Sequence, residues 1–392
     1  MAQPSVVDDD EFRPDIEGLR AVAVVVVVLF HARVARFSGG FVGVDVFFVL
    51  SGFLITRLLL REVARTGTIS LRHFWARRAR RLLPASCVVV VVTVIAAQVL
   101  LAPIAQRPLA TDSLAAGGFA INFVFASRLG DYFASQLGQT PSPLLHFWSL
   151  AVEEQFYFVW PIAMVVLTRL RTAAMRNWAV ALLAASAALS LLLASGAPTQ
   201  PRIYLGTDTR ASQLIAGAVL AMIVSHHRGA RAWLTKVAPV GLPASLLLIV
   251  AAVLSVHVAG LKRFIPVYSH GCLALFGVLV AATVGFLMFA PANPITRALS
   301  TRPLVAIGRY SYAIYLWHVL VINLFSANNV FGWHVVEIRN VGIRTAVVVA
   351  VTIAIAALSM RFVEAPLQRR LFPWANQAAK PHADIETVGA HA

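Results

Sequence analysis

The sequence predicts an all-α integral membrane protein that crosses the bilayer about ten times. Of its residues, 59% are hydrophobic and 13% are charged, whereas soluble domains carry roughly one-quarter charged residues. Apolar runs of about 20 residues, long enough for roughly 30 Å of hydrocarbon, recur along the chain. The expected spans are residues 17–36, 40–61, 82–103, 145–168, 178–196, 209–226, 237–258, 271–290, 308–327 and 341–362.

The distribution of basic residues predicts the orientation of these spans. With a cytoplasmic N-terminus, most of the 33 Lys and Arg residues fall on the inner side. A weaker run, residues 113–127, contains Gly117, Gly118 and Asn122. Counting it as a span would turn the later basic loops outward. We therefore expect both termini in the cytoplasm and a short re-entrant or interfacial segment at 113–127.

One domain is expected, residues 12–370, between a polar N-terminal tail, 1–11, and a flexible C-terminal tail, 371–392. A nucleic-acid module clusters its basic residues on a soluble face, but here the arginines lie in short loops between apolar runs. The net charge of +16 is better explained by topology and by membrane lipid as a partner. We expect no nucleic-acid partner. Cys87 and Cys272 form no C-x-x-C pair, and no metal site is predicted.

The first span carries two ionisable groups, Arg20 and His31, in "EGLRAVAVVVVVLFH". Eleven helical residues turn to within about 20° of three full turns and rise about 16 Å, so both side chains lie on one face. Arg20 is expected near the inner surface and His31 near the bilayer midplane. An anchor and an ordinary interhelical hydrogen bond are the simpler explanation, but ionisable groups inside spans usually mark function.

Other spans direct ionisable groups to similar depths. Asp45 is expected about 8 Å below the outer surface, Glu153 and Glu154 about 10 to 12 Å below His146, and His318 about 15 Å above the inner end of its span. Because buried carboxylates are usually paired, we expect His31 to meet Asp45 or a glutamate of span 145–168. A carboxylate on one ring nitrogen would fix the tautomer of His31 and make it a general base.

A basic loop precedes the third span in "LRHFWARRARRLLPAS". On a helix from Ser70, Arg77 and Arg81 are four residues apart and Arg78 and Arg81 three, so these guanidinium groups are expected to form one cationic patch. Such a patch can bind phosphates bidentately. A topology signal that binds anionic lipid is the other interpretation.

Seven stretches together resemble the membrane-bound acyltransferase 3 family, the OafA/YrhL-like O-acyltransferases. In chain order they are "FRPDIEGLRAVAVVVVVLFH" with its R-x10-H spacing, "GGFVGVDVFFVLSGFLIT", "FWARRARRLLPA" with an RxxR element, "LLHFWSLAVEEQFYFVWP", "TDTRASQLIAGAVLA", "IGRYSYAIYLWHVLV" and "RFVEAPLQRR". Each alone is weak, but seven in family order are specific.

The resemblance implies a multi-pass enzyme of the bacterial cytoplasmic membrane that moves an acyl group, commonly acetyl, from cytoplasmic acyl-CoA to a hydroxyl of a surface carbohydrate or glycolipid. Acyl-CoA is then a co-substrate, and no permanently bound cofactor is expected. By residue, the resemblance implies His31 as the catalytic histidine and Arg78 and Arg81 as ligands of the CoA phosphates. The depths estimated above add Asp45, Glu153 and Glu154 as candidate catalytic carboxylates. Acyl-CoA would bind Arg20, Arg77, Arg78 and Arg81. Further pocket candidates are His146, Trp148, Arg210, Tyr312 and His318.

Several alternatives remain open at this point. His31 fits either a general base or a nucleophile that carries the acyl group, and Ser51 is interpreted as small-residue helix packing. Many family members have a C-terminal SGNH hydrolase-like domain, and this sequence shows no Gly-Asp-Ser or Asp-x-x-His motif of such a domain. We expect either a stand-alone member or a shortened chain whose second transfer step needs a separate SGNH-type partner. The rival function is a proton-coupled transporter or flippase in which the midplane histidine and carboxylates relay protons.

Overall fold

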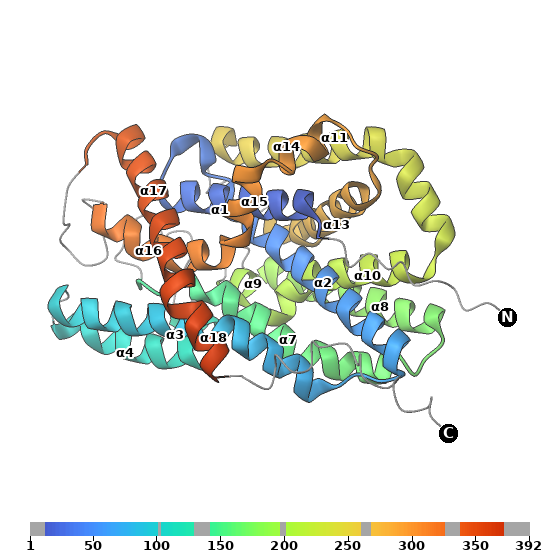
Figure 1. Ribbon diagram of the computed structural model, residues 1–392, viewed down its shortest axis with the longest axis horizontal. Helices are drawn as coiled ribbons and strands as arrows, with labels where there is room; N and C mark the ends of the chain where they lie inside the picture. Colours follow the sequence, from blue (N-terminus) through green and yellow to red (C-terminus); the bar gives the residue numbers. More distant parts are fainter. Residues whose placement is uncertain are drawn as a thin grey trace, which may run out of the picture.

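The computed structural model describes residues 12–100, 103–128, 142–196, 201–259, 268–325 and 338–371, and within these ranges it contains helices and no strand (Figure 1). The expected all-α architecture is thus confirmed for the described part of the chain. Tail 1–11, and tail 371–392 apart from its first residue, lie outside the described residues.

A helix occupies each of the ranges expected to span the membrane. These helices are α1 (Pro14–His31), α2 (Gly43–Thr66), α3 (Leu71–Leu100), α7 (Phe147–Leu167), α8 (Thr172–Gly196), α10 (Thr207–His226), α11 (Arg228–Ala259), α13 (Leu273–Phe289), α16 (Ser311–Phe325) and α17 (Val341–Ser359). Shorter elements connect them: η1 (Ala35–Phe37), η2 (Gly40–Val42), α4 (Pro103–Gly117), α5 (Ile121–Arg128), α9 (Pro201–Leu205), η3 (Tyr268–Cys272), α14 (Pro294–Leu299), α15 (Arg302–Arg309), η4 (Met360–Glu364) and α18 (Ala365–Leu371).

Seven of the described helices are long and apolar enough to cross a membrane. They include α2, α3, α7, α8, α11, α13 and α17, and an eighth span results if α15 and α16, bent by 74°, are counted as one. Helix α1 is not among them because it carries three charged residues, Asp15, Glu17 and Arg20, within its 18 residues. The protein is therefore a multi-pass membrane protein, while ten spans with both termini inside stay a prediction.

The segment 113–127 forms the end of α4, a break and most of α5. The break is a tight turn in which Phe119 has a left-handed φ of 50°. Across it, Arg128 donates to the carboxylate of Asp112 at 2.7 Å. Neither helix has the length of a span, as expected for a re-entrant or interfacial segment, and its position relative to the bilayer stays a prediction.

Helix α2 crosses the middle of the molecule, where it packs on α10 more extensively than any other pair of described helices packs (Figure 1). Two glycines allow this contact. A Cβ on Gly52 would lie 1.7 Å from the Leu214 carbonyl oxygen, and one on Gly217 would lie 2.0 Å from that of Val49. Small residues of this kind let membrane helices approach closely.

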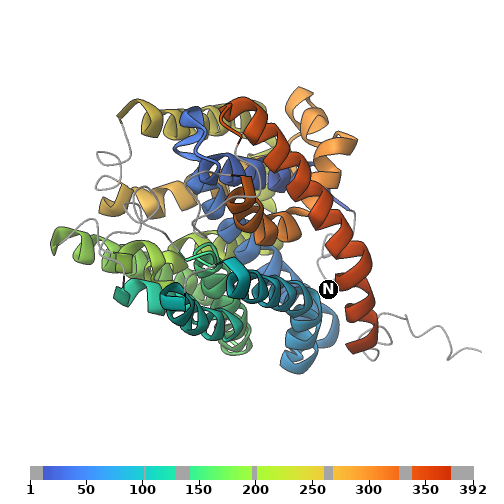
Figure 2. The same ribbon diagram turned by 90° about the vertical axis from the view of Figure 1, so that its left-hand side faces the viewer.

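Helix α1 fits against α14, α15 and α16 on another side of α2. A Cβ on Gly18 would lie 1.9 Å from the Leu299 carbonyl oxygen, and one on Gly308 would lie 2.0 Å from that of Glu17. Helix α17 runs obliquely along one side of the molecule, as the second view shows clearly (Figure 2). Side chains from α1, α2, α3, α7 and α16 line one shared space inside the protein.

Replacing Gly52 with Ala is expected to lower stability by about 1 to 3 kcal/mol, because the new methyl group must push α2 away from α10. The thermal unfolding midpoint of the purified protein in detergent measures this loss. Gly229→Ala is the matched control, since a Cβ there meets no atom within 4 Å. Equal midpoints for the two variants would contradict the close approach of α2 and α10.

Candidate functional site

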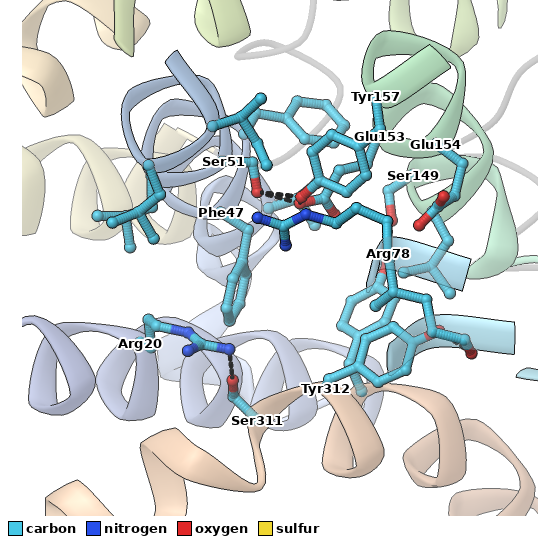
Figure 3. Close-up of a pocket in the computed structure, with 18 of the residues that line it drawn as sticks. Arg20, Phe47, Ser51, Arg78, Ser149, Glu153, Glu154, Tyr157, Ser311 and Tyr312 are labelled. Carbon is cyan, nitrogen blue, oxygen red and sulfur yellow. Dashed lines mark hydrogen bonds between the residues drawn. The ribbon is translucent and has the colours of Figure 1, made fainter. Parts of the chain in front are cut away.

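A polar pocket lies between α1, α2, α3, α7 and α16 (Figure 3). Its volume is about 120 Å³, and it collects side chains that are far apart in the sequence. The polar residues that line it are Arg20, Ser51, Arg78, Arg81, Ser149, Glu153, Glu154, Tyr157, Ser311, Tyr312 and Tyr315. The apolar ones, mostly from α2, include Phe47, Phe48, Leu54 and Ile55. The pocket thus has charged and polar walls and one apolar wall.

Arginines enter this pocket from two helices. Arg20 donates to the Glu17 carboxylate at 3.0 Å and to the Ser311 hydroxyl at 2.9 Å, so both neighbours fix its guanidinium. The Arg78 guanidinium lies over the ring of Tyr157, 5.2 Å from its centroid. Arg81 also lines the pocket. Three arginines from sequence-distant helices therefore converge where a phosphate could bind.

Arg77, expected in the same patch, does not line the pocket. Its guanidinium lies 3.7 Å from the Glu62 carboxylate of α2, and its side chain is 41% exposed. Successive helical residues are separated by about 100°, so Arg77 and Arg78 leave α3 in different directions. The expectation of a single patch was wrong for Arg77.

The acidic wall of the pocket comes from α7. Glu153 accepts hydrogen bonds from the Ser51 and Tyr157 hydroxyls, and the Tyr157 hydroxyl also lies 2.9 Å from the Ser51 oxygen (Figure 3). Sequence reasoning missed both hydroxyls. Tyr157 follows Glu153 by four residues, a helical spacing that could have revealed it. Ser51 gave no such signal, and its interpretation as packing alone was wrong.

Three histidines meet beyond one wall of this pocket, His31 from α1, His318 from α16 and His146 at the start of α7. The His31 Nδ1 lies 3.3 Å from the His318 Nε2, and the ring centroids of His318 and His146 are 5.2 Å apart. His146 and His318 are 2% and 0% exposed. The convergence of buried histidines near the end of α1 confirms the expectation that these distant segments meet.

The expected pairing of His31 with a carboxylate was wrong. Within the described part of the chain, the hydrogen-bond partners of His31 are the Val27 carbonyl, 3.0 Å from Nδ1, and His318. Glu153 instead accepts hydrogen bonds from two hydroxyl groups that line the pocket. No group of three His, Cys, Asp or Glu side chains in the described ranges could hold a metal ion.

Asp45 pairs with Arg210 rather than with a histidine. The Arg210 Nη2 lies 2.5 Å from the Asp45 Oδ1, and both side chains are fully buried. The guanidinium also lies over the rings of Phe48, Trp148 and Tyr204, at 5.3, 5.5 and 4.8 Å. Arg210 and Trp148, two expected pocket residues, do not line the pocket. This cluster joins α2, α7, α9 and α10 in the core.

Tyr315 connects the pocket to the histidines. Its side chain lines the pocket, and its hydroxyl donates to the His146 carbonyl at 3.0 Å and lies 2.6 Å from the Ser149 hydroxyl. Its own carbonyl lies 2.6 Å from the His318 Nδ1. Tyr312, another expected pocket residue, lines the pocket and donates to the Leu82 carbonyl at 3.0 Å. The arginine-lined pocket and the histidine cluster thus adjoin along α16.

A family model described as "Acyltransferase domain" matches residues 13–361 of this chain. The chain belongs to this acyltransferase family. The resemblance drawn from the seven motifs is confirmed, and the transporter interpretation receives no support. The pocket and the histidines therefore belong to a multi-pass membrane protein of this family.

Among curated proteins, this acyltransferase is similar to the "Peptidoglycan O-acetyltransferase OatA" of Listeria monocytogenes, with 36% identity over 373 residues. It is 35% identical over 369 residues to the "Putative peptidoglycan O-acetyltransferase YrhL" of Bacillus subtilis, and 32% identical over 384 residues to the "O-acetyltransferase OatA" of Staphylococcus aureus. These alignments cover 92% of this chain but 57%, 55% and 58% of the relatives. The chain thus spans little more than half the length of these relatives. No solved structure matches it.

Asp45→Leu is expected to destabilise this acyltransferase by about 3 to 5 kcal/mol, because it leaves the Arg210 charge in the core without its carboxylate. Arg210→Met should cost a similar amount. The double variant should recover most of the loss, since it removes both charges. Thermal unfolding in detergent measures all three, and a double variant no more stable than the single ones would contradict a mainly structural pair.

Proposed function

We propose that this protein transfers an acyl group, with acetyl as the leading candidate, from cytoplasmic acyl-CoA to a hydroxyl of a cell-wall glycan. The observation that carries the proposal is the convergence of Arg20, Arg78 and Arg81 in one pocket that adjoins the buried histidines through Tyr315. Two of the relatives are named peptidoglycan O-acetyltransferases, and this supports both the acetyl group and the glycan acceptor. A surface glycolipid is the other acceptor class with a suitable hydroxyl.

The donor enters from the inner side in this proposal, since that is where the basic loop before α3 is expected. Arg78 and Arg81 bind phosphates of CoA, and Arg20 completes the cationic wall. The negative charge near the donor is offset in part, because Glu153 accepts from two hydroxyls and three arginines line the same pocket. The acyl end of the donor extends along α16 past Tyr315 and Ser149 toward His31.

His31 acts as the general base in this scheme. Its Nε2 takes the proton of the acceptor hydroxyl while the hydroxyl oxygen forms an ester bond to the thioester carbonyl carbon. The carbon–sulfur bond breaks, and the leaving thiolate takes the proton from the imidazolium, giving CoA thiol. If His31 instead carries the acyl group, its Nε2 attacks the thioester carbonyl carbon, the carbon–sulfur bond breaks and CoA leaves as the thiolate. The acceptor hydroxyl then attacks the acyl-imidazole, the nitrogen–carbon bond breaks as the ester forms, and the hydroxyl proton goes to the thiolate.

The setting of this reaction is the bacterial cytoplasmic membrane, with surrounding lipid and the acceptor glycan as partners. A protein of the SGNH type is the proposed partner for a second transfer to the glycan. Acyl-CoA is consumed in each turnover and serves as co-substrate.

His31→Ala is expected to lower acyl transfer by roughly 10²- to 10⁴-fold, the usual contribution of a positioned base. Purified protein in liposomes with radiolabelled acetyl-CoA and a soluble glycan fragment measures the transfer. His73→Ala, a substitution of an exposed histidine on α3, is the control and should retain activity. Transfer by His31→Ala at the wild-type rate, with equal amounts of folded protein, would overturn the assignment.

Replacing Arg78 and Arg81 with Gln together is expected to weaken acyl-CoA binding by roughly tenfold or more, because two charge-assisted contacts to phosphate are lost. Isothermal titration with CoA in detergent gives the affinity without requiring an acceptor. Arg77→Gln is a matched control on the same helix, since Arg77 faces Glu62 outside the pocket. Equal loss in the control would indicate a general charge effect and contradict a specific site.

A further inference from the structure

The His318 ring lies between a backbone carbonyl and His31. Its Nδ1 is 2.6 Å from the Tyr315 carbonyl oxygen, and its Nε2 is 3.3 Å from the His31 Nδ1. A carbonyl oxygen can only accept a hydrogen bond, so the His318 Nδ1 must carry the proton. In a neutral imidazole the other nitrogen is then an acceptor, which leaves the His318 Nε2 able to accept from His31.

The proton of the His31 ring lies on Nδ1 for the same reason. Its Nδ1 lies 3.0 Å from the Val27 carbonyl oxygen one turn earlier in α1, so Nδ1 carries a proton there as well. That N–H is shared between Val27 and the His318 Nε2. The remaining nitrogen, Nε2, is buried and has no hydrogen-bond partner among the described residues. The Nε2 atom therefore carries a lone pair that can take a proton.

The hydrogen-bond partner of His31 is a neutral imidazole, that of His318, whereas a catalytic histidine often has a carboxylate as its partner. A carboxylate would stabilise a charged imidazolium in the resting protein, but His318 offers only a lone pair. Isolated charges are costly in such a buried site, so the resting rings are neutral. Once the His31 Nε2 takes a proton, its Nδ1–H still donates to His318 and Val27.

His146 restricts the His318 ring from another side. Its ring lies edge-on, 5.2 Å between centroids and at 74°, and its Nε2 lies 3.1 Å from the Leu316 carbonyl oxygen. The centroid of the Tyr315 phenol ring lies 5.3 Å from that of the His318 ring. These neighbours oppose rotation of the His318 ring, which would exchange its donor and acceptor nitrogens.

We propose that His318 is a positioning residue that holds His31 in the tautomer with the proton on Nδ1, so that Nε2 is the proton acceptor. The inference rests on the proposed role of His31 as the base. Its tautomer test, however, requires neither acyl donor nor acceptor, and so the two proposals can fail separately.

Nitrogen-15 spectra of histidine-labelled protein in nanodiscs measure the tautomer directly, and His31→Ala assigns the His31 signals by their loss. The wild type should show a protonated Nδ1 and an unprotonated Nε2 at His31. In His318→Leu, which removes one of the two acceptors of this N–H and leaves the Val27 carbonyl, the fraction of His31 with the proton on Nε2 should rise. A wild-type protein with the proton on Nε2, or an unchanged tautomer in His318→Leu, would overturn the inference.

Kinetics of acyl transfer provide the functional test, with two substitutions at the same position. His318→Leu should lower kcat by roughly 10²-fold, the lower range for a general base, with the acyl-CoA KM within about twofold because the arginine pocket is intact. His318→Gln should restore much of kcat, since its amide oxygen accepts from His31 and its amide nitrogen donates to Tyr315.

The outcomes of these kinetic tests separate the proposals. Unchanged kcat in His318→Leu beside an inactive His31→Ala would overturn the role of His318 and retain that of His31. An active His31→Ala would overturn the base assignment, while the nitrogen-15 result would still decide whether His318 sets the tautomer. Equal losses in His318→Leu and His318→Gln would indicate ring packing rather than hydrogen bonding and would contradict the inference.

Discussion

The contact between α2 and α10, closed by the buried pair of Asp45 and Arg210, is the interaction on which the rest of the structure depends. Two unpaired charges in an apolar interior would be costly, so the 2.5 Å contact and the aromatic rings around Arg210 must form together. One of those rings, Trp148, lies two residues after His146 on α7. The ion pair therefore also fixes the start of α7, where His146 and Ser149 lie.

A second constraint is the close approach of α1 to the C-terminal helices. The glycines at 18 and 308 allow α1 to lie against the backbone of α14 and α15, and α16 follows directly after the bend. As a result, α1 meets α16 twice, at Arg20 with Ser311 and at His31 with His318. The arginine-lined pocket and the histidine cluster thus lie at two ends of the contact between α1 and α16, and their separation follows from the rise of α1 between its arginine and its histidine.

Much of this arrangement could be predicted from local patterns. Apolar length located the helices, and the arginine-to-histidine spacing on α1 placed both groups on one face because a helix repeats every 3.6 residues. Depth along each helix predicted that ionisable groups from distant segments would converge, as His31, His146 and His318 do. The same reasoning failed for Arg77 and for the partner of His31, because which neighbour a side chain meets depends on helix rotation and crossing, and neither is encoded in a single helix.

Polar partners were the least predictable feature. Asp45 meets an arginine from α10, and Ser51 meets Glu153 from α7, only because α2, α7 and α10 pack side by side. Competition also matters, since Arg210 is a permanent charge and binds a buried carboxylate more strongly than a neutral imidazole does. With Asp45 taken by Arg210 and Glu153 held by hydroxyls, His31 meets a second histidine instead.

The sequence by itself determined that the chain is a helical membrane protein, that it resembles the acyltransferase family, and which arginines and histidines have helical positions suited to a common site. These features depend on composition and on the repeat of one helix, which a single chain segment contains. The tertiary structure alone decided that Asp45 is a core ion-pair residue, that Arg77 faces away from the pocket, and that His31 has a histidine partner. Those outcomes depend on distances between helices, which are set by close packing at a few glycines and by the requirement that every buried charge be paired.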